Sequence, residues 1–224
     1  MADKHNDNIP AVTNQITEDV ADIKENLEFH KDCFEKLCTG WSNTATTTLG
    51  YITTIWVPAS AMIARATNGA AAGIVEKTTN DNMYAYYAFD ATTQQYVGFS
   101  VAMPEGWNVS TIKAKFYWSS AASSTAGDTV EWQINGIAVS NSDALDVAFG
   151  TAKVISDTLL SNDGAELQVS DATDALTVGG TPALGDMINF VVSRNVSGTD
   201  DMTENAWLFG VLLQITETES VAAW

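Results

Sequence analysis

Residues 129–139 read TVEWQINGIAV and carry the pattern that decides the fold, a period-two run of aromatic and β-branched residues. Such a run is typical of a β-strand, because successive side chains point to opposite faces of a sheet. Similar runs recur after Gly40, where threonine, serine, glycine and alanine become dense and charged residues thin out. They are YITTIWV (51–57), MYAYYAF (83–89), QYVGFSVAM (95–103), TIKAKFYW (111–118), MINFVVSR (187–194) and WLFGVLLQIT (207–216).

Turn signals separate these runs. Turns such as SSTAGD (123–128) and VGGTPALGD (178–186) lie between them, and no long helical pattern intervenes. Eight or so short strands arranged in this way predict an all-β sandwich or barrel. Weaker strands are predicted near residues 61–66 and 165–170. The segment 143–160, DALDVAFGTAKVISDTLL, fits either one helix or two short extended pieces.

Composition limits the classes of function. The chain of 224 residues is 46% hydrophobic and 17% charged, so it can bury a core. Its formal net charge of −18 repels phosphate groups, and we therefore expect neither nucleic acid nor an anionic membrane surface as a partner. The sequence shows no apolar run of about 18 residues and no signal-peptide pattern. We expect synthesis in a cytoplasm.

The N-terminal part differs from the rest. We predict a polar leader over residues 1–13, a helix over 14–39 and the β domain over 40–224. Pro10 discourages a helix before it, and Gly40 supplies a C-terminal stop. Apolar-type positions recur along the helix at spacings of four and three, which is the heptad pattern of a coiled coil. These positions are Ile16, Val20, Ile23, Leu27, His30, Phe34 and Leu37.

The heptad pattern predicts a parallel homotrimer with those seven residues at its interface. Isoleucine at the d positions, Ile16 and Ile23, favours three or more strands. His30 also falls on the seam, where a single polar side chain tends to fix register and oligomer state. The alternative is that the helix packs against its own β domain and that His30 reaches solvent.

The cysteines, Cys33 and Cys38, lie on facing flanks of neighbouring helices in this arrangement. They are five residues apart, so on one helix they point to different sides and do not bridge easily. Between chains they could form a ring of disulfides. The alternative is two small reduced residues of the kind that a cytoplasm maintains.

The β domain lacks the side chains of most catalytic centres. No histidine or cysteine follows Cys38, so the domain cannot supply a Ser-His-Asp triad, a Cys-His dyad or a histidine metal cluster by itself. Paired carboxylates of the kind that hydrolyse glycosides remain possible, but nineteen acidic residues make some close pair inevitable. We therefore expect no enzyme and no cofactor. The candidate acids are Asp90, Glu105, Asp128, Glu131, Asp186 and Glu204.

Two acidic loops raise the question of calcium. SNDGAELQVSDATD (161–174) and SGTDDMTEN (197–205) each offer several carboxylates, and calcium is bound by six to eight oxygen atoms. Neither loop has the spacing of an EF-hand, so solvated turns are the favoured interpretation and we predict no metal site.

Aromatic residues are the remaining candidates for a binding surface. The chain has seven tryptophans, and MYAYYAF (83–89) places aromatic side chains on both faces of one predicted strand. Alternating aromatic residues indicate a core or a subunit interface more often than an exposed platform on which a sugar stacks. We favour the interface, with the sugar platform as the alternative.

Five longer segments give the β domain a family resemblance. They are IWVPASAMIARATNGAAAG (55–73), FDATTQQYVGFSVAMPEGWN (89–108), FYWSSAASSTAGDTVEW (116–132), DVAFGTAKVISDTL (146–159) and GDMINFVVSRNVSGTDDMTENAWLFGVLLQI (185–215). With them the chain resembles small virion-surface proteins of tailed bacteriophages, of the capsid-decoration and head-fibre type. The resemblance implies a jelly-roll-like β-sandwich that assembles as a trimer on the virion exterior and is anchored by its N-terminal part.

That resemblance implies a structural function. We expect a homotrimeric cement or head fibre protein at the virion surface, whose partners are the phage capsid or other virion proteins. The alternative is a tail fibre protein that recognises a glycan on the host surface.

Overall fold

The computed structural model describes residues 50–122, 124–161 and 166–218. The predicted leader, the heptad helix over residues 14–39 and the domain boundary near residue 40 lie outside the described residues, so they stay predictions.

The described residues form β-strands and one short 3-10 helix, η1 (Ala59–Ala61). The mainly β class predicted from the sequence is therefore confirmed. The strands are β1 (Tyr51–Pro58), β2 (Ile63–Ala64), β3 (Ala71–Lys77), β4 (Asn82–Phe89), β5 (Tyr96–Ala102), β6 (Trp107–Ser120), β7 (Thr129–Val139), β8 (Lys153–Thr158), β9 (Gln168–Val169), β10 (Met187–Arg194) and β11 (Ala206–Glu217).

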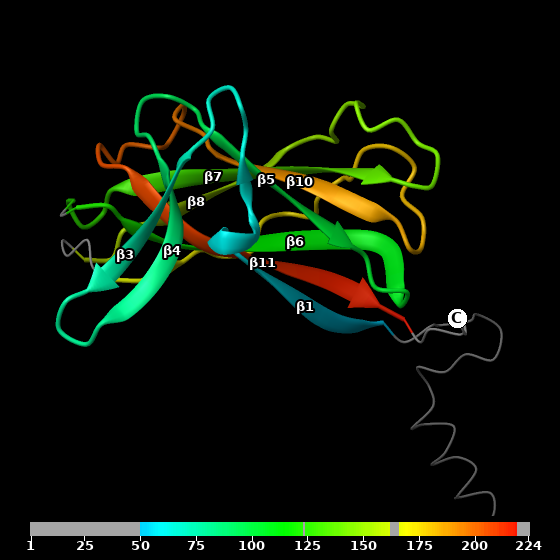
Figure 1. Ribbon diagram of the computed structural model, residues 1–224, viewed down its shortest axis with the longest axis horizontal. Helices are drawn as coiled ribbons and strands as arrows, with labels where there is room; N and C mark the ends of the chain where they lie inside the picture. Colours follow the sequence, from blue (N-terminus) through cyan, green and yellow to red (C-terminus); the bar gives the residue numbers. More distant parts are fainter. Residues whose placement is uncertain (1–49, 123, 162–165, 219–224) are drawn as a thin grey trace, which may run out of the picture. The chain divides into compact units, whose positions relative to one another are not determined.

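Two antiparallel sheets pack face to face as a sandwich (Figure 1). The six-stranded sheet has the order β3-β4-β11-β6-β9, and β1 also pairs with β11. The five-stranded sheet has the order β2-β5-β10-β7-β8. Two strands pair in succession along one edge of β11: β4 pairs with residues 206–208 and β1 with residues 210–217. A register shift between Leu208 and Gly210 separates the two pairings.

The chain crosses repeatedly between the sheets. β4, β5, β6 and β7 belong alternately to the six-stranded and the five-stranded sheet, and β10 and β11 are again in different sheets. Such crossings, with antiparallel neighbours throughout each sheet, are typical of jelly-roll and Greek-key sandwiches.

Most strands lie where the sequence predicts them. All seven strong runs are strands, with ends shifted by a few residues. The largest shift is at β6, which begins at Trp107, four residues before the predicted run 111–118. The two weaker runs are strands of two residues each, β2 and β9.

The secondary structure of two segments could be assigned only from the structure. β3 has the sequence AAGIVEK, without aromatic residues, and it lies at the edge of the six-stranded sheet with several exposed side chains. The undecided segment 143–160 contains one strand, β8, and residues 143–152 are irregular. The helical alternative for this segment is therefore wrong, because its second half pairs with β7 and completes the five-stranded sheet.

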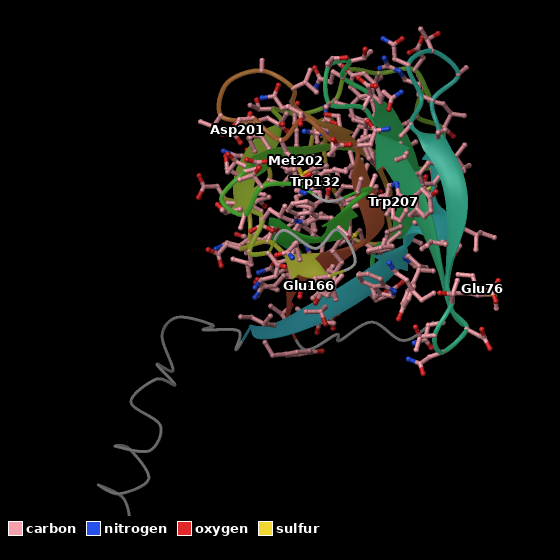
Figure 2. The ribbon with its side chains drawn as sticks, turned by 90° about the vertical axis from the view of Figure 1, so that its left-hand side faces the viewer. Glu76, Trp132, Glu166, Asp201, Met202 and Trp207 are labelled. Carbon is pink, nitrogen blue, oxygen red and sulfur yellow. The ribbon has the colours of Figure 1, made fainter. Side chains whose placement is uncertain are left out.

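Trp132 lies at the centre of the core, between the two sheets (Figure 2). Its ring packs edge-on against Phe89 and parallel to Phe116, with centroid distances of 5.2 and 5.5 Å. Trp118 and Trp107 are also fully buried. Three tryptophans are therefore core residues, which explains the alternating aromatic pattern of β6 and β7.

Candidate functional site

The residues that the sequence assigns to a trimer interface lie outside the described part of the chain. They stay predictions, as does the interchain disulfide. They are Ile16, Val20, Ile23, Leu27, His30, Phe34, Leu37, Cys33 and Cys38.

Two of the carboxylates considered for catalysis, Asp90 and Asp186, close turns. Asp90 accepts hydrogen bonds from the backbone N–H and hydroxyl of Thr92, both at 2.7 Å, and these bonds hold the pKa of Asp90 below its usual range. Asp186 accepts from the Ser140 hydroxyl at 2.6 Å and from the backbone N–H of Ala183 at 2.8 Å. Asp90 and Asp186 thus each stabilise the loop in which they lie.

The acidic loop 197–205 is held by hydrogen bonds that its carboxylates accept from residues of β7 and β10. Asp200 accepts from Nε and Nη2 of the buried Arg194 at 2.8 and 2.6 Å, and from the backbone N–H of Glu131 at 3.0 Å. Asp201 accepts from the backbone N–H and hydroxyl of Thr129 at 2.6 and 2.8 Å. Within the described residues, no group of three or more acidic, histidine or cysteine side chains could hold a metal ion.

A groove of about 360 Å³ lies on the outer side of the five-stranded sheet, along β2, β5 and β10. Its floor contains Gly98, which lies between Tyr96 and Ser100 on the same face of β5. A glycine at this position leaves the space open that a side chain would fill. The lining residues with side chains of interest are Ile63, Arg65, Tyr96, Ser100, Asn189 and Val191.

Arg65 and Tyr96 form a stacked pair at one end of the groove. The guanidinium carbon of Arg65 lies 3.7 Å from the centroid of the Tyr96 ring, which is a cation–π contact. The Arg65 Nε–H donates to the carbonyl of Thr67 at 2.8 Å and so fixes the guanidinium plane. In the turn that follows β2, Asn68 adopts a left-handed φ of 54° and its carbonyl accepts a hydrogen bond from the backbone N–H of Tyr96 at 2.8 Å.

Ser100 and Asn189 supply neutral polar groups along the groove. They are paired across β5 and β10, and the Ser100 hydroxyl donates to Asn189 Oδ1 at 3.3 Å. This bond leaves the amide nitrogen of Asn189 and a lone pair of Ser100 for other partners.

Further amides continue this face beyond Tyr96. Ser193 is opposite Tyr96 in the β5–β10 register and opposite Gln133 in the β10–β7 register. Gln94 donates its amide nitrogen to Gln133 Oε1 at 3.0 Å and to the Ser193 hydroxyl at 3.1 Å. The outer side of the five-stranded sheet is therefore rich in side chains that both donate and accept hydrogen bonds.

The outer side of the six-stranded sheet is different, since aromatic rings lie on it; we call it the aromatic face. Figure 2 shows Trp207 on this side of β11 and Trp132 on the inner side of its own sheet. Trp56 and Tyr84 are each 46% exposed. Three ring pairs make up the aromatic face: Tyr86 with Trp207 at 4.2 Å, Trp56 with Tyr117 at 4.9 Å, and Tyr84 with Phe209 at 5.7 Å.

A second hollow, of about 530 Å³, lies where the β3–β4 hairpin meets η1. Small residues line much of it, among them Ala59, Ser60 and Ala72, together with Ile74 and Tyr87. It presents few groups that could orient a polar ligand.

The sequence did not single out Arg65, Ser100 or Asn189. The available signal was alternation, because the positions of β5 and β10 that alternate with buried apolar residues mark the outer face of a sheet. Which of those residues meet depends on strand register, and Ser100 and Asn189 are 89 positions apart in the sequence.

No protein-family model and no curated protein matches this chain. Among solved structures, the chain is similar to the CBM22-1 xylan-binding domain of Xyn10C from Paenibacillus barcinonensis, with 7% identity over 78% of this chain and 100% of that one and a TM-score of 0.42. It is also similar to a family 11 carbohydrate-binding module from Clostridium thermocellum, with 14% identity over 76% and 91% of the chains and a TM-score of 0.34. For TmCBM61 in complex with β-1,4-galactotriose, the identity is 10% over 72% and 86% and the TM-score 0.32. At this level of similarity no family is identified.

No helix within the described residues is long and apolar enough to span a membrane.

Proposed function

We propose that this chain is a carbohydrate-binding protein without catalytic activity, and that its saccharide lies in the groove over β2, β5 and β10. The observation that carries the proposal is the lining of this groove, where the Arg65–Tyr96 stack and the Ser100–Asn189 pair flank an open floor at Gly98.

The chemistry of the lining suits a sugar. A saccharide presents hydroxyls that both donate and accept hydrogen bonds, together with C–H groups that pack on flat or apolar surfaces. Asn189 and Ser100 can each donate and accept. The Arg65–Tyr96 stack and the side chains of Ile63 and Val191 offer apolar and planar contact area. A site of this kind, mostly apolar with a few placed polar groups, is typical of small-molecule binding.

Binding without hydrolysis is proposed because none of the described residues that line the groove carries a carboxylate. Glycoside hydrolysis uses two carboxyl groups on either side of the scissile bond. In the described residues, Asp90 and Asp186 are engaged in their own loops, as described above.

The test is glycan-array screening of the full chain followed by calorimetric titration of the best saccharide. Tyr96→Ala should weaken binding by about tenfold, since it removes the ring on which Arg65 lies. Tyr84→Ala is the matched control, because it removes a ring of the same kind from the aromatic face. Loss of binding in the Tyr84 variant but not in the Tyr96 variant would place the site on the other sheet, and the absence of any bound glycan would overturn the proposal.

We propose further that the chain is a virion-surface subunit of a tailed bacteriophage, a homotrimeric cement or head fibre protein or a glycan-recognising tail fibre protein. The aromatic face favours an assembled protein, because exposed Trp56 and Tyr84 are of the residue types enriched in protein interfaces. Glycan binding and virion attachment are compatible, since the groove and the aromatic face lie on different sheets.

Light scattering of the pure full-length chain tests the assembly. A mass of three subunits of 24.0 kDa is expected, and a monomer alone would contradict the trimer. Cryo-electron microscopy of a particle carrying the protein would then distinguish capsid decoration from a tail position.

A further inference from the structure

We infer that the groove selects saccharides that carry a carboxylate, of the hexuronic acid class, and that Arg65 is the residue that binds the carboxylate. This inference rests on the proposed carbohydrate-binding function and adds the class of sugar to it.

The charge of the groove is opposite to that of the protein. The chain has 28 acidic residues against 10 basic ones, yet the described residues that line the groove include Arg65 and no aspartate or glutamate. The chain has two arginines, Arg65 and Arg194. Arg194 is fully buried in its ion pair with Asp200, whereas Arg65 is exposed at the groove. Arg65 is thus the arginine that can meet a ligand.

The geometry of Arg65 leaves the two terminal nitrogens of its guanidinium group available to a ligand. Its Nε–H is engaged with the Thr67 carbonyl and its plane lies on the Tyr96 ring. Within the described residues, its two terminal nitrogens make no hydrogen bond or ion pair. A guanidinium fork matches the two oxygens of a carboxylate, and the stacking and the Nε bond pre-organise it before the ligand arrives. Less conformational freedom is then lost on binding.

Neutral groups complete the recognition. Ser100 and Asn189 follow Gly98 along the groove, so a sugar whose carboxylate meets Arg65 can place ring hydroxyls toward the hydroxyl and the amide. The remaining charges of the protein oppose an anion, but they act at longer range. At physiological ionic strength, charges more than about 8 Å away are largely screened, while a direct contact is not.

The experiment compares matched sets of three sugars on the full-length protein at about 0.15 M salt. Each set consists of a hexuronate oligosaccharide, the same oligosaccharide with methyl-esterified carboxyl groups, and its neutral hexose counterpart, and sets of several hexose types are used. Arg65→Gln removes the charge and the fork, and Arg65→Lys retains the charge alone. Lys77→Gln, on the β3–β4 hairpin outside the groove, makes the same charge change as the first variant.

We expect the wild type to bind one hexuronate at least about tenfold more tightly than its ester and its neutral counterpart, because charge-assisted hydrogen bonds are the stronger kind. Arg65→Gln should remove this preference, Arg65→Lys should retain part of it, and Lys77→Gln should retain all of it. Thermal melting should show all three variants folded.

Other outcomes overturn different statements. Equal binding of the acidic and neutral sugars, or equal effects of the Arg65→Gln and Lys77→Gln variants, would overturn the inference and leave the proposed function intact. A sulfated sugar is titrated as a further ligand, and tighter binding of it than of the hexuronate would overturn the assignment of a carboxylate. Binding of no saccharide, acidic or neutral, would overturn the proposed function itself.

Discussion

Trp118 on β6 donates its indole N–H to the carboxylate of Asp157 on β8 at 2.7 Å, so one hydrogen bond joins the two sheets of the sandwich. Burial raises the pKa of Asp157 above its ordinary value of 3.8, and the bond from Trp118 offsets only part of this effect. The charged form of Asp157 is therefore less favourable in the folded state than in the unfolded state.

Asp157→Asn should be at least as stable as the wild type at pH 7, because the amide still accepts from Trp118 and carries no charge to desolvate. With the folded-state pKa raised, protonation of Asp157 stabilises the wild type as the pH falls through that pKa, so the advantage of the variant should shrink toward pH 3.8 and below. Urea unfolding at several pH values measures this.

Asp90→Asn is the control of opposite sign. The pKa of Asp90 is lowered by its bonds from Thr92 and Thr93, so its contribution is present near neutral pH and is lost as the pH falls through that lowered pKa. This variant should be less stable than the wild type at pH 7. The same direction of change in both variants would contradict the assignment.

Trp118→Phe should destabilise the protein more than Trp132→Phe, by about 1–2 kcal/mol. Both rings are fully buried, but the indole N–H of Trp132 has no hydrogen-bond partner among the described residues. Replacing Trp118 removes the donor to Oδ2 of the half-buried Asp157 and leaves only the backbone N–H of Thr158, whereas replacing Trp132 removes an unsatisfied group. Denaturant unfolding of the two variants decides between this order and the reverse.

Asp200→Asn should cost about 3–5 kcal/mol of unfolding free energy, because it leaves the buried Arg194 without its counter-charge. Asp201→Asn is a neighbouring control with the same chemical change. Its carboxylate is exposed and bonded to Thr129, so its loss should be clearly smaller. Equal losses would show that the loop, and not the ion pair, determines the effect.

Gly73→Ala should destabilise the protein by about 1–3 kcal/mol, because a Cβ at this position would lie 2.4 Å from the ring of Tyr86. The same substitution should cost much less in a Tyr86→Ala background, since the three nearest atoms all belong to the Tyr86 side chain. A double-mutant cycle measures this coupling. Additive effects would mean that the backbone and not the ring excludes the methyl group.

Asn189→Asp keeps the size of the side chain and adds a negative charge to the groove. On the proposed function and the inferred class of sugar, it should weaken binding of a hexuronate far more than binding of the neutral counterpart, because like charges repel at short range. Calorimetric titration of both sugars measures the difference. Equal weakening of both sugars would show that the carboxylate does not come near Asn189.

Strands with strong alternation could be predicted from the sequence because one face of each is buried. β7 is the clearest case, since Val130, Trp132 and Ile134 all point into the core. β3 could not be predicted in this way, because an edge strand with exposed Ile74 has no buried face to impose alternation. The undecided segment 143–160 became a strand only where β7 was available as a partner.

The candidate groove is a product of tertiary structure. Arg65 follows the two-residue strand β2, and Tyr96 is 31 positions later, so their stacking depends on the pairing of β2 with β5. No local sequence pattern predicts such a contact. The aromatic residues could be foreseen as a group, but their division between the core and the aromatic face depends on which side of each strand faces the other sheet.

β1 and β11 run antiparallel over eight residue pairs, and Tyr51 at the start of β1 is opposite Glu217 at the end of β11. The chain therefore enters and leaves the described β domain at the same corner. Tension applied to both strands together reaches the domain at that corner and does not stretch the sandwich. Tension that pulls the two strands apart instead breaks their hydrogen bonds one pair at a time, because these bonds lie across the strands.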